Sequence, residues 1–138
     1  MEALRVVEVW KDAVSRGDMD AFGALYAPDA LLFVPLSPEP IKGRQAIQQY
    51  EGGFHCAFPA ATLSVLRSLS GGDRIAVEWE YSGTNTGPLA TAAGVLPPTD
   101  QRMSVRGASF FRVDLAGLIA EEYRYYDTRS LFQQLGIS

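Results

Sequence analysis

The second half of the sequence alternates between apolar and polar residues, and this pattern restricts the fold more than any other feature. In RIAVEWEY, residues 74–81, every second residue from Ile75 to Tyr81 is apolar. Three further segments are predicted as strands: TLSVLRSL (62–69), RMSVRGASFFRV (102–113) and LIAEEYRYYD (118–127). Because successive side chains of a strand point to opposite faces, this alternation places one face of each strand against a core. We therefore expect antiparallel strands that follow one another along the sheet.

The first half has helical periodicity instead. Apolar spacing, caps and prolines predict helices at 2–15, 18–26, 43–56 and 128–135, and an apolar strand at 30–36. Helices followed by a run of strands are typical of an α+β fold, with the helices segregated to one face of a curved antiparallel sheet. Such a sheet, closed by N-terminal helices, forms a cone with an apolar interior. An apolar small-molecule ligand is the expected occupant of that interior.

Length, charge and cysteine content restrict the class of protein further. The 138 residues are expected to form a single domain over 1–138. The net charge of −4 and the absence of a clustered basic face predict no nucleic acid partner. No signal-peptide pattern and no run of about 18 apolar residues occur, which predicts no membrane association and a cytoplasmic location. Cys56 is the only cysteine, so no internal disulfide can form, and we expect it to be a buried apolar filler.

The segment YRYYDTRSLFQQLG, residues 123–136, contains the first candidate catalytic residue, Asp127. If Tyr123 and Tyr125 face the interior of the cone, Asp127 shares their parity and faces it too. A carboxyl group among aromatic rings loses hydration and is suited to proton transfer near neutral pH. The same position also suits an N-cap for the helix that follows, a role that would lower the pKa instead. Both roles of Asp127 stay open.

Further candidates are a histidine and a set of aromatic residues. His55, the only histidine, is a second catalytic candidate, although four residues after Glu51 it also suits a surface ion pair. The aromatic residues are candidates for the lining of a ligand cavity or for the plain core: Trp10, Tyr26, Phe33, Phe54, Phe58, Trp79 and Tyr125. No group of His, Cys or Asp residues has the spacing of metal ligands, so no metal site is predicted.

Two other segments have candidate roles. Residues 82–100 hold several glycines and prolines and few anchoring side chains, which indicates a functional or mobile loop and a candidate lid. On the predicted strand at 102–113, Arg102, Arg106 and Arg112 share one side with Phe110. A sheet face of this mixed character suits the contact of a homodimer, and it equally suits a solvated surface.

Several motifs resemble a known superfamily. WKDAVSRGDMDAFGALYAPDALLFVP followed by IKGRQAIQQY resembles the opening of the nuclear transport factor 2-like superfamily, and the likeness extends over essentially the whole chain. FHCAFPAATLSV, SGTNTGPL, LPPTDQRMSV and YYDTRSLFQQLG are similar to the SnoaL-like polyketide cyclases. The resemblance implies a cone-shaped, cystatin-like α+β barrel, a homodimer, and no metal or organic cofactor. It also implies an aldol-type ring closure of a polyketide ester, with Asp127 matched to the family's aspartate acid/base.

The chain departs from other patterns of the superfamily. Steroid isomerases carry an acidic residue just before the proline of their first strand, where this sequence has Val34, and a second acid where it has Ser109. They carry a tyrosine where it has Trp10. The leading hypothesis is a cofactor-free cyclase or isomerase acting on an apolar, carbonyl-bearing molecule. The alternatives are a non-catalytic ligand-binding domain of the same fold and a dimerising scaffold for a protein partner.

Overall fold

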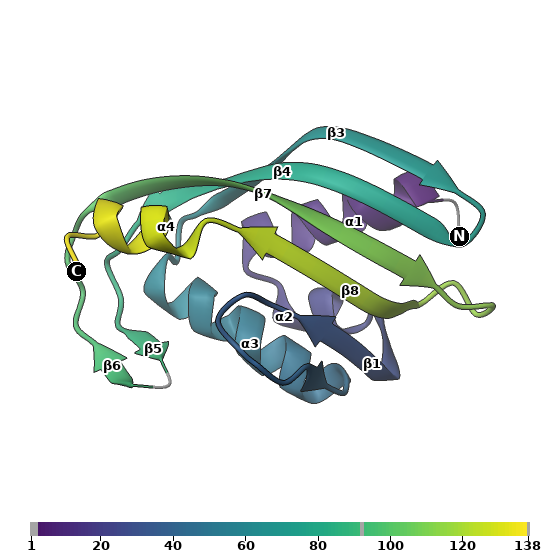
Figure 1. Ribbon diagram of the computed structural model, residues 1–138, viewed down its shortest axis with the longest axis horizontal. Coiled ribbons are helices and arrows are strands. Elements are labelled where there is room, and N and C mark those ends of the chain that lie inside the picture. Colours follow the sequence, from purple (N-terminus) through teal and green to yellow (C-terminus); the bar gives the residue numbers. More distant parts are fainter. Residues whose placement is uncertain (1–2, 92, 138) are drawn as a thin grey trace.

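A computed structural model describes residues 3–91 and 93–137 of the chain. The helices are α1 (Ala3–Arg16), α2 (Met19–Gly23), α3 (Arg44–Ala57) and α4 (Thr128–Gln134). The strands are β1 (Tyr26–Phe33), β2 (Ile41–Lys42), β3 (Thr62–Gly71), β4 (Arg74–Thr84), β5 (Leu89–Thr91), β6 (Gly94–Leu96), β7 (Arg102–Val113) and β8 (Ile119–Tyr126). The predicted α+β class is confirmed: α1, α2 and α3 precede the long strands β3, β4, β7 and β8, and α4 ends the chain's order of elements (Figure 1).

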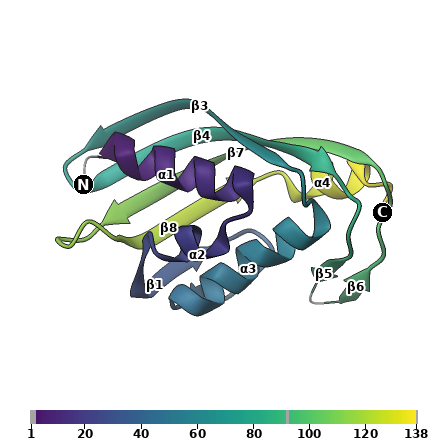
Figure 2. The same cartoon turned by 180° about the vertical axis from the view of Figure 1, so that it is seen from behind.

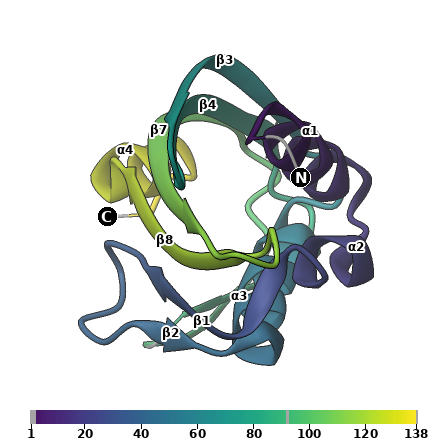
Figure 3. The ribbon, with the colours of Figure 1, turned by 90° about the vertical axis from the view of Figure 1, so that its right-hand side faces the viewer.

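The sheet is curved and closes around the helices. Its six strands have the order β2-β1-β8-β7-β4-β3, antiparallel except for the parallel pair of β1 and β8. Seen end-on, the sheet bends into an open cone, and α1, α2 and α3 close its open side (Figure 3). From behind, α1 and α3 lie across the concave face (Figure 2). The strands are long enough to twist and coil, which is what bends a sheet into this shape.

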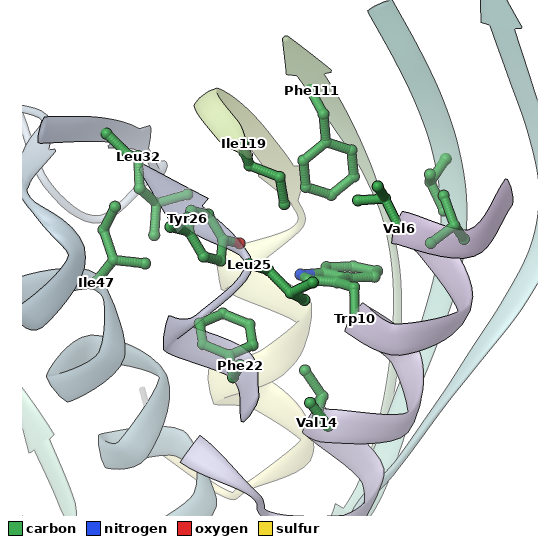
Figure 4. Close-up of a cluster of buried hydrophobic side chains, with 14 of the residues drawn as sticks. Val6, Trp10, Val14, Phe22, Leu25, Tyr26, Leu32, Ile47, Phe111 and Ile119 are labelled. Carbon is green, nitrogen blue, oxygen red and sulfur yellow. The ribbon is translucent and has the colours of Figure 1, made fainter. Parts of the chain in front are cut away.

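The main hydrophobic core lies between the helices and the sheet. Helix α1 contributes an apolar stripe at helical spacing, made of Val6, Val7, Trp10, Ala13 and Val14. This stripe packs against the concave face, where the ring of Trp10 meets the ring of Phe111 edge-on with centroids 5.3 Å apart (Figure 4). Complete burial of one such aromatic or branched side chain stabilises the fold by roughly 1.5–3 kcal/mol.

Three predicted elements differ from the structure. Helix α2 ends at Gly23, and β1 begins at Tyr26 and runs through Pro28, where helix 18–26 was expected to end. The pairing of β1 with β8 is interrupted between Tyr26 and Leu31, so the missing N–H of Pro28 removes no bond from the ladder. Leu69, expected on the inner face with Leu63, is 78% exposed because a bulge after Val65 reverses the parity of β3.

The segment 82–100 has more structure than a mobile loop. Strand β4 continues to Thr84, and a two-stranded hairpin of β5 and β6 projects at the end of the molecule where α4 lies (Figure 1). Asn85 is buried and anchors the segment, donating to the carbonyl groups of Ala57 and Gly87 and accepting from the backbone and hydroxyl of Thr99. The role of a lid stays a prediction.

Candidate functional site

A cavity of about 50 Å³ lies between the helices and the concave face of the sheet. Its aromatic lining consists of Trp10, Phe54, Phe58, Trp79, Tyr81 and Tyr126. Its remaining lining consists of Val14, Leu63, Val105, Leu131, Glu51 and Arg124. Every major layer of the fold therefore contributes to the wall, from α1 and α3 through the strands to α4. Most of the wall is apolar, and a charged pair provides its polar part.

The charged pair joins α3 to β8. Arg124 Nη1 donates to Glu51 Oε1 at 2.9 Å, and both side chains are more than nine-tenths buried. Glu51 lies one helical turn after Ile47, on the inner face of α3, so the helix points the carboxylate toward the sheet. Among the residues that the structure describes, this is the one hydrogen bond that Glu51 accepts. Its carboxylate therefore retains accepting capacity at the cavity wall.

Glu122, also fully buried, holds Arg124 from the other side. Arg124 donates through Nε to Glu122 Oε2 at 2.8 Å and through Nη2 to Glu122 Oε1 at 3.2 Å. The hydroxyl of Tyr26 donates to Glu122 Oε1, and the hydroxyl of Ser109 donates to Oε2 at 2.9 Å. A carboxylate with four donors is fully satisfied, so Glu122 has the geometry of a support for Arg124 rather than of a group free to react.

The indole of Trp79 extends this network. Its Nε1 donates to Ser109 Oγ at 3.0 Å, which fixes the ring against the cavity. Gly107, opposite Trp79 on β7, has no side chain, and a Cβ there would lie 2.5 Å from the ring. Only glycine leaves room for the ring at this position.

Burial and charge set the protonation states of the network. Burial lowers the pKa of Arg124, but the carboxylates of Glu122 and Glu51 outweigh this effect and hold that pKa well above its usual value. Burial, together with the neighbouring Glu122 carboxylate, raises the pKa of Tyr26 well above its usual value. Arg124 is therefore a permanent cation at any ordinary pH, and Tyr26 a permanent donor.

Neutral hydrogen-bond donors lie in the cavity wall and next to it. Burial is the largest cause of a raised pKa in Tyr81, Tyr126 and Tyr50, so all three phenols keep their protons at neutral pH. The hydroxyls of Tyr50 and Tyr126 lie 3.5 Å apart. Trp10 Nε1 is buried and has no hydrogen-bond partner in the part of the chain that the structure describes. An acceptor oxygen on a bound molecule would satisfy such a donor.

Asp127 lies outside the cavity. Its side chain is exposed and accepts a hydrogen bond from the backbone N–H of Ser130 at 3.0 Å, as the N-cap of α4. The expectation that it faces a dry interior is wrong, because Glu122, Arg124 and Tyr126 are the residues that point inward in the second half of β8. Tyr123 and Tyr125 are on the convex face. The N-cap interpretation, which the sequence left open, is the one that the geometry fits.

The other predicted site residues divide into two groups. Four line the cavity as expected: Trp10, Phe54, Phe58 and Trp79. Tyr26 lies behind the cavity and acts through Glu122. Phe33 stacks on Tyr123, with ring centroids 4.3 Å apart, and Tyr125 is 56% exposed, so neither lines the cavity.

The two residues at the end of α3 also lie away from the cavity wall. His55 is half-buried, and its ring packs over Gly17. Cys56 is exposed, and the prediction of a buried cysteine is wrong because it occupies the outer face of α3. No group of three potential metal ligands occurs among the described residues, and none of the described helices has the length and apolar character needed to cross a membrane.

Sequence reasoning missed the two charged residues of the cavity, Glu51 and Arg124. The signal for Glu51 was its spacing of four residues from the apolar Ile47, which puts both on one helical face. The signal for Arg124 was weaker. It shares one face of β8 with Glu122 and Tyr126, so an inward assignment makes three polar residues face the core. A strand pattern alone favours the opposite assignment.

A curved sheet closed by helices around an apolar cavity is the architecture of α+β domains with a ketosteroid isomerase-like fold. Within it, the family model described as SnoaL-like domain matches residues 7–122. The chain belongs to the SnoaL-like domain family.

One known relative is similar over part of its length. A steroid Δ-isomerase from Nocardioides simplex is 36% identical over 70 residues, which cover 51% of this chain and 57% of that protein. The chain thus matches little more than half the length of this relative.

Solved structures show the same fold. A candidate SnoaL-like polyketide cyclase from Jannaschia sp. CCS1 superposes with a TM-score of 0.83 at 17% identity, covering 98% of this chain and 92% of that one. Wild-type IdmH, a candidate polyketide cyclase from Streptomyces antibioticus, gives a TM-score of 0.80 at 22% identity, covering 99% and 100%. At these identities the likeness establishes the fold.

Proposed function

We propose that this chain is a SnoaL-like enzyme that performs cofactor-free acid–base chemistry, an aldol-type ring closure or an isomerisation, on an apolar, carbonyl-bearing small molecule. Glu51, rather than Asp127, is the proton-transferring group in this proposal. The observation that carries it is the position of the Glu51 carboxylate, buried at the wall of an apolar cavity with accepting capacity left.

The cavity supplies the groups that carbon deprotonation needs. A carboxylate in a water-poor site accepts a proton from the carbon next to a carbonyl group, and the enolate that forms requires hydrogen-bond donors at its oxygen. The phenols of Tyr81 and Tyr126 are protonated donors in the same wall, and the N–H of Trp10 has no partner among the described residues. Arg124 fixes the orientation of the carboxylate.

The size of the cavity sets a condition on the substrate. One water needs about 10–15 Å³ of such space, so about 50 Å³ holds three to five water-sized groups. A polycyclic substrate therefore enters only if part of the wall moves. Leu131 of the short helix α4 closes the wall at one end, which makes α4 a suitable element to move.

Exchange of carbon-bound hydrogen tests the proposal directly. A panel of ketones and esters, from butanone to polycyclic compounds, is incubated with the protein in D₂O, and deuterium uptake next to the carbonyl group is followed by NMR. We expect uptake with the wild-type chain and a loss of about 10²–10⁴-fold in Glu51→Gln. Asp127→Asn is the control and retains full exchange. Equal exchange in Glu51→Gln and wild type would refute the assignment of Glu51.

A second candidate function is ligand binding without chemistry. The ion pair between Glu51 and Arg124 favours it, because the pair holds both side chains in place at the cavity wall and requires no reaction to do so. In this case members of the panel bind, as their NMR line widths show, while deuterium uptake equals that of the buffer. The same experiment therefore separates the two functions.

We also propose that two copies of the chain associate through the convex face of the sheet. Phe110 and Tyr125 meet there with ring centroids 6.1 Å apart and are 49% and 56% exposed. Ion pairs of Arg106 with Glu80 and of Arg112 with Glu121 flank them, and an apolar centre with a charged rim is typical of an interface.

The dimer is tested by the molar mass in solution, measured by light scattering. We expect the mass of two chains for the wild type and of one chain for Phe110→Glu. Leu115→Glu is the matched control, because Leu115 is fully exposed in the turn between β7 and β8 and its substitution leaves the dimer intact. A wild-type mass of one chain would contradict the proposal.

A further inference from the structure

The buried charges of the cavity do not balance. Glu51 and Glu122 share one guanidinium, that of Arg124, so one negative charge remains when all three groups are ionised. Tyr26, Tyr81 and Tyr126 stay neutral and add no charge. A buried charge is normally paired, because leaving it unpaired in an apolar environment is costly. The site is therefore one positive charge short.

The accepting capacity lies on the cavity side of the cluster. Glu122 is behind Arg124 and has four donors, whereas Glu51 lines the cavity and has one among the described residues. A positive group that enters the cavity therefore meets Glu51 first. Arg124 already directs its Nε, Nη1 and Nη2 donors at the two carboxylates.

The rest of the wall suits a cation as well. Half of the lining residues are aromatic: Trp10, Phe54, Phe58, Trp79, Tyr81 and Tyr126. The faces of aromatic rings carry negative potential, and they stabilise alkylammonium groups while also accommodating the attached methyl groups. Tryptophan is the most effective of these rings, and the cavity has two. An alkylammonium group has the charge and the apolar surface that this wall fits.

The volume limits the size of the group. Space for three to five water-sized groups corresponds to about three to five non-hydrogen atoms. We propose that the cavity binds a small alkylammonium group, with its nitrogen facing Glu51 and its carbon atoms against the aromatic rings. The inference goes beyond the proposed function, because it concerns the charge of the ligand and requires no reaction.

Two pairs of compounds that differ only in charge test this inference. Tert-butylammonium is compared with tert-butanol, and formate with formamide, because all four are small enough for the cavity. None of these carries hydrogen on a carbon atom next to a carbonyl group, so the acid–base chemistry proposed above plays no part. Binding is followed through the indole N–H signals in NMR spectra, since both tryptophans of the chain, Trp10 and Trp79, line the cavity.

We expect tert-butylammonium to bind at least tenfold more tightly than tert-butanol, and formate at least tenfold more weakly than formamide. Glu51→Gln brings tert-butylammonium and tert-butanol within threefold of each other. Glu39→Gln makes the same chemical change on an exposed loop and keeps the wild-type ratio. A thermal melt of each variant verifies that it is folded.

Every other result overturns the inference. Equal affinities within each pair would mean that the cluster has no preference for a positive charge, and tighter binding of formate than of formamide would mean that Arg124 dominates the site. If no compound shifts the indole signal of either tryptophan, the cavity does not bind groups of this size. The proposed function and this inference are tested independently. None of these binding results changes the outcome of the deuterium-exchange test, and the preference for a charged ligand can be measured even if no exchange is found.

Discussion

Replacement of Arg124 by methionine is expected to destabilise the chain strongly. The guanidinium makes three charge-assisted hydrogen bonds, at 2.8 and 3.2 Å to Glu122 and at 2.9 Å to Glu51. Methionine keeps most of the apolar stem and removes the charge, so two buried carboxylates are left without a counterion. Removing one partner from a buried ion pair costs about 3–5 kcal/mol. Since domains are stable by about 5–15 kcal/mol, this is a large share of the total.

The assay is urea unfolding at pH 7, followed by tryptophan fluorescence and by circular dichroism. For a chain of this size the loss corresponds to a fall in Tm of roughly 10–20 °C. Because the folded-state pKa of Arg124 is raised, its contribution is complete below the unfolded pKa and is lost only at extreme alkaline pH. Arg124 is therefore fully charged in the wild type at pH 7. The full difference in free energy of unfolding between wild type and Arg124→Met is expected at that pH.

The triple variant Glu51→Gln/Arg124→Met/Glu122→Gln is the control. It removes the uncompensated charges together with the guanidinium, and we expect it to recover more than half of the loss. A loss below about 1 kcal/mol in Arg124→Met would refute the reasoning, because that is the value of an exposed ion pair. A triple variant less stable than Arg124→Met would refute it as well.

Three further predictions follow from the same contacts. Asp127→Ala removes the N-cap of α4 and is expected to lower the free energy of unfolding by about 1 kcal/mol, as measured by urea unfolding. Deuterium exchange into the ketones and esters is expected to stay unchanged. Asp127→Asn keeps the cap and is expected to change neither quantity. Stability is expected to fall as the pH rises above about 10, by up to 1.4 kcal/mol per pH unit for each buried phenol, because the unfolded chain releases protons that the folded chain retains. The phenols concerned are those of Tyr26, Tyr50, Tyr81 and Tyr126. Urea unfolding at pH 8, 10 and 11 measures the effect, and equal stability at all three would contradict it. Asn85→Ala is expected to cost about 3 kcal/mol and to accelerate hydrogen exchange at the Thr99 N–H, since the buried amide of Asn85 bonds three residues. Gln101→Ala, an exposed substitution directly after this segment, leaves both unchanged.

Most of the architecture was predictable from local patterns. The alternation of β4 and β7 placed Val77 and Trp79 on the inner face and Phe110 on the outer face, and the structure confirms all three. The spacing of apolar residues located α1 and α3 to within a residue or two. Periods of two and of 3.6 residues follow from backbone geometry, so they can be recognised in the sequence without knowledge of the partner elements.

The candidate site was predictable only in part. Aromatic residues at core spacing identified four of the cavity residues, including Trp10 and Trp79. The polar residues were assigned wrongly, because on β8 the aromatic Tyr123 and Tyr125 face outward while Glu122 and Arg124 face the core. Polar residues are usually assigned to the solvent side of a strand, and this rule fails when distant groups neutralise them.

The sequence by itself determined the class of fold, the order of its elements and the apolar character of the interior, because these depend on patterns that repeat over a few residues. Only the tertiary structure decided which carboxylate faces the cavity. Glu51 and Arg124 are 73 residues apart in the chain, and each is tolerated in the core because the other is there. A charge is buried only where a partner compensates it, and which partner is available depends on how the whole sheet closes.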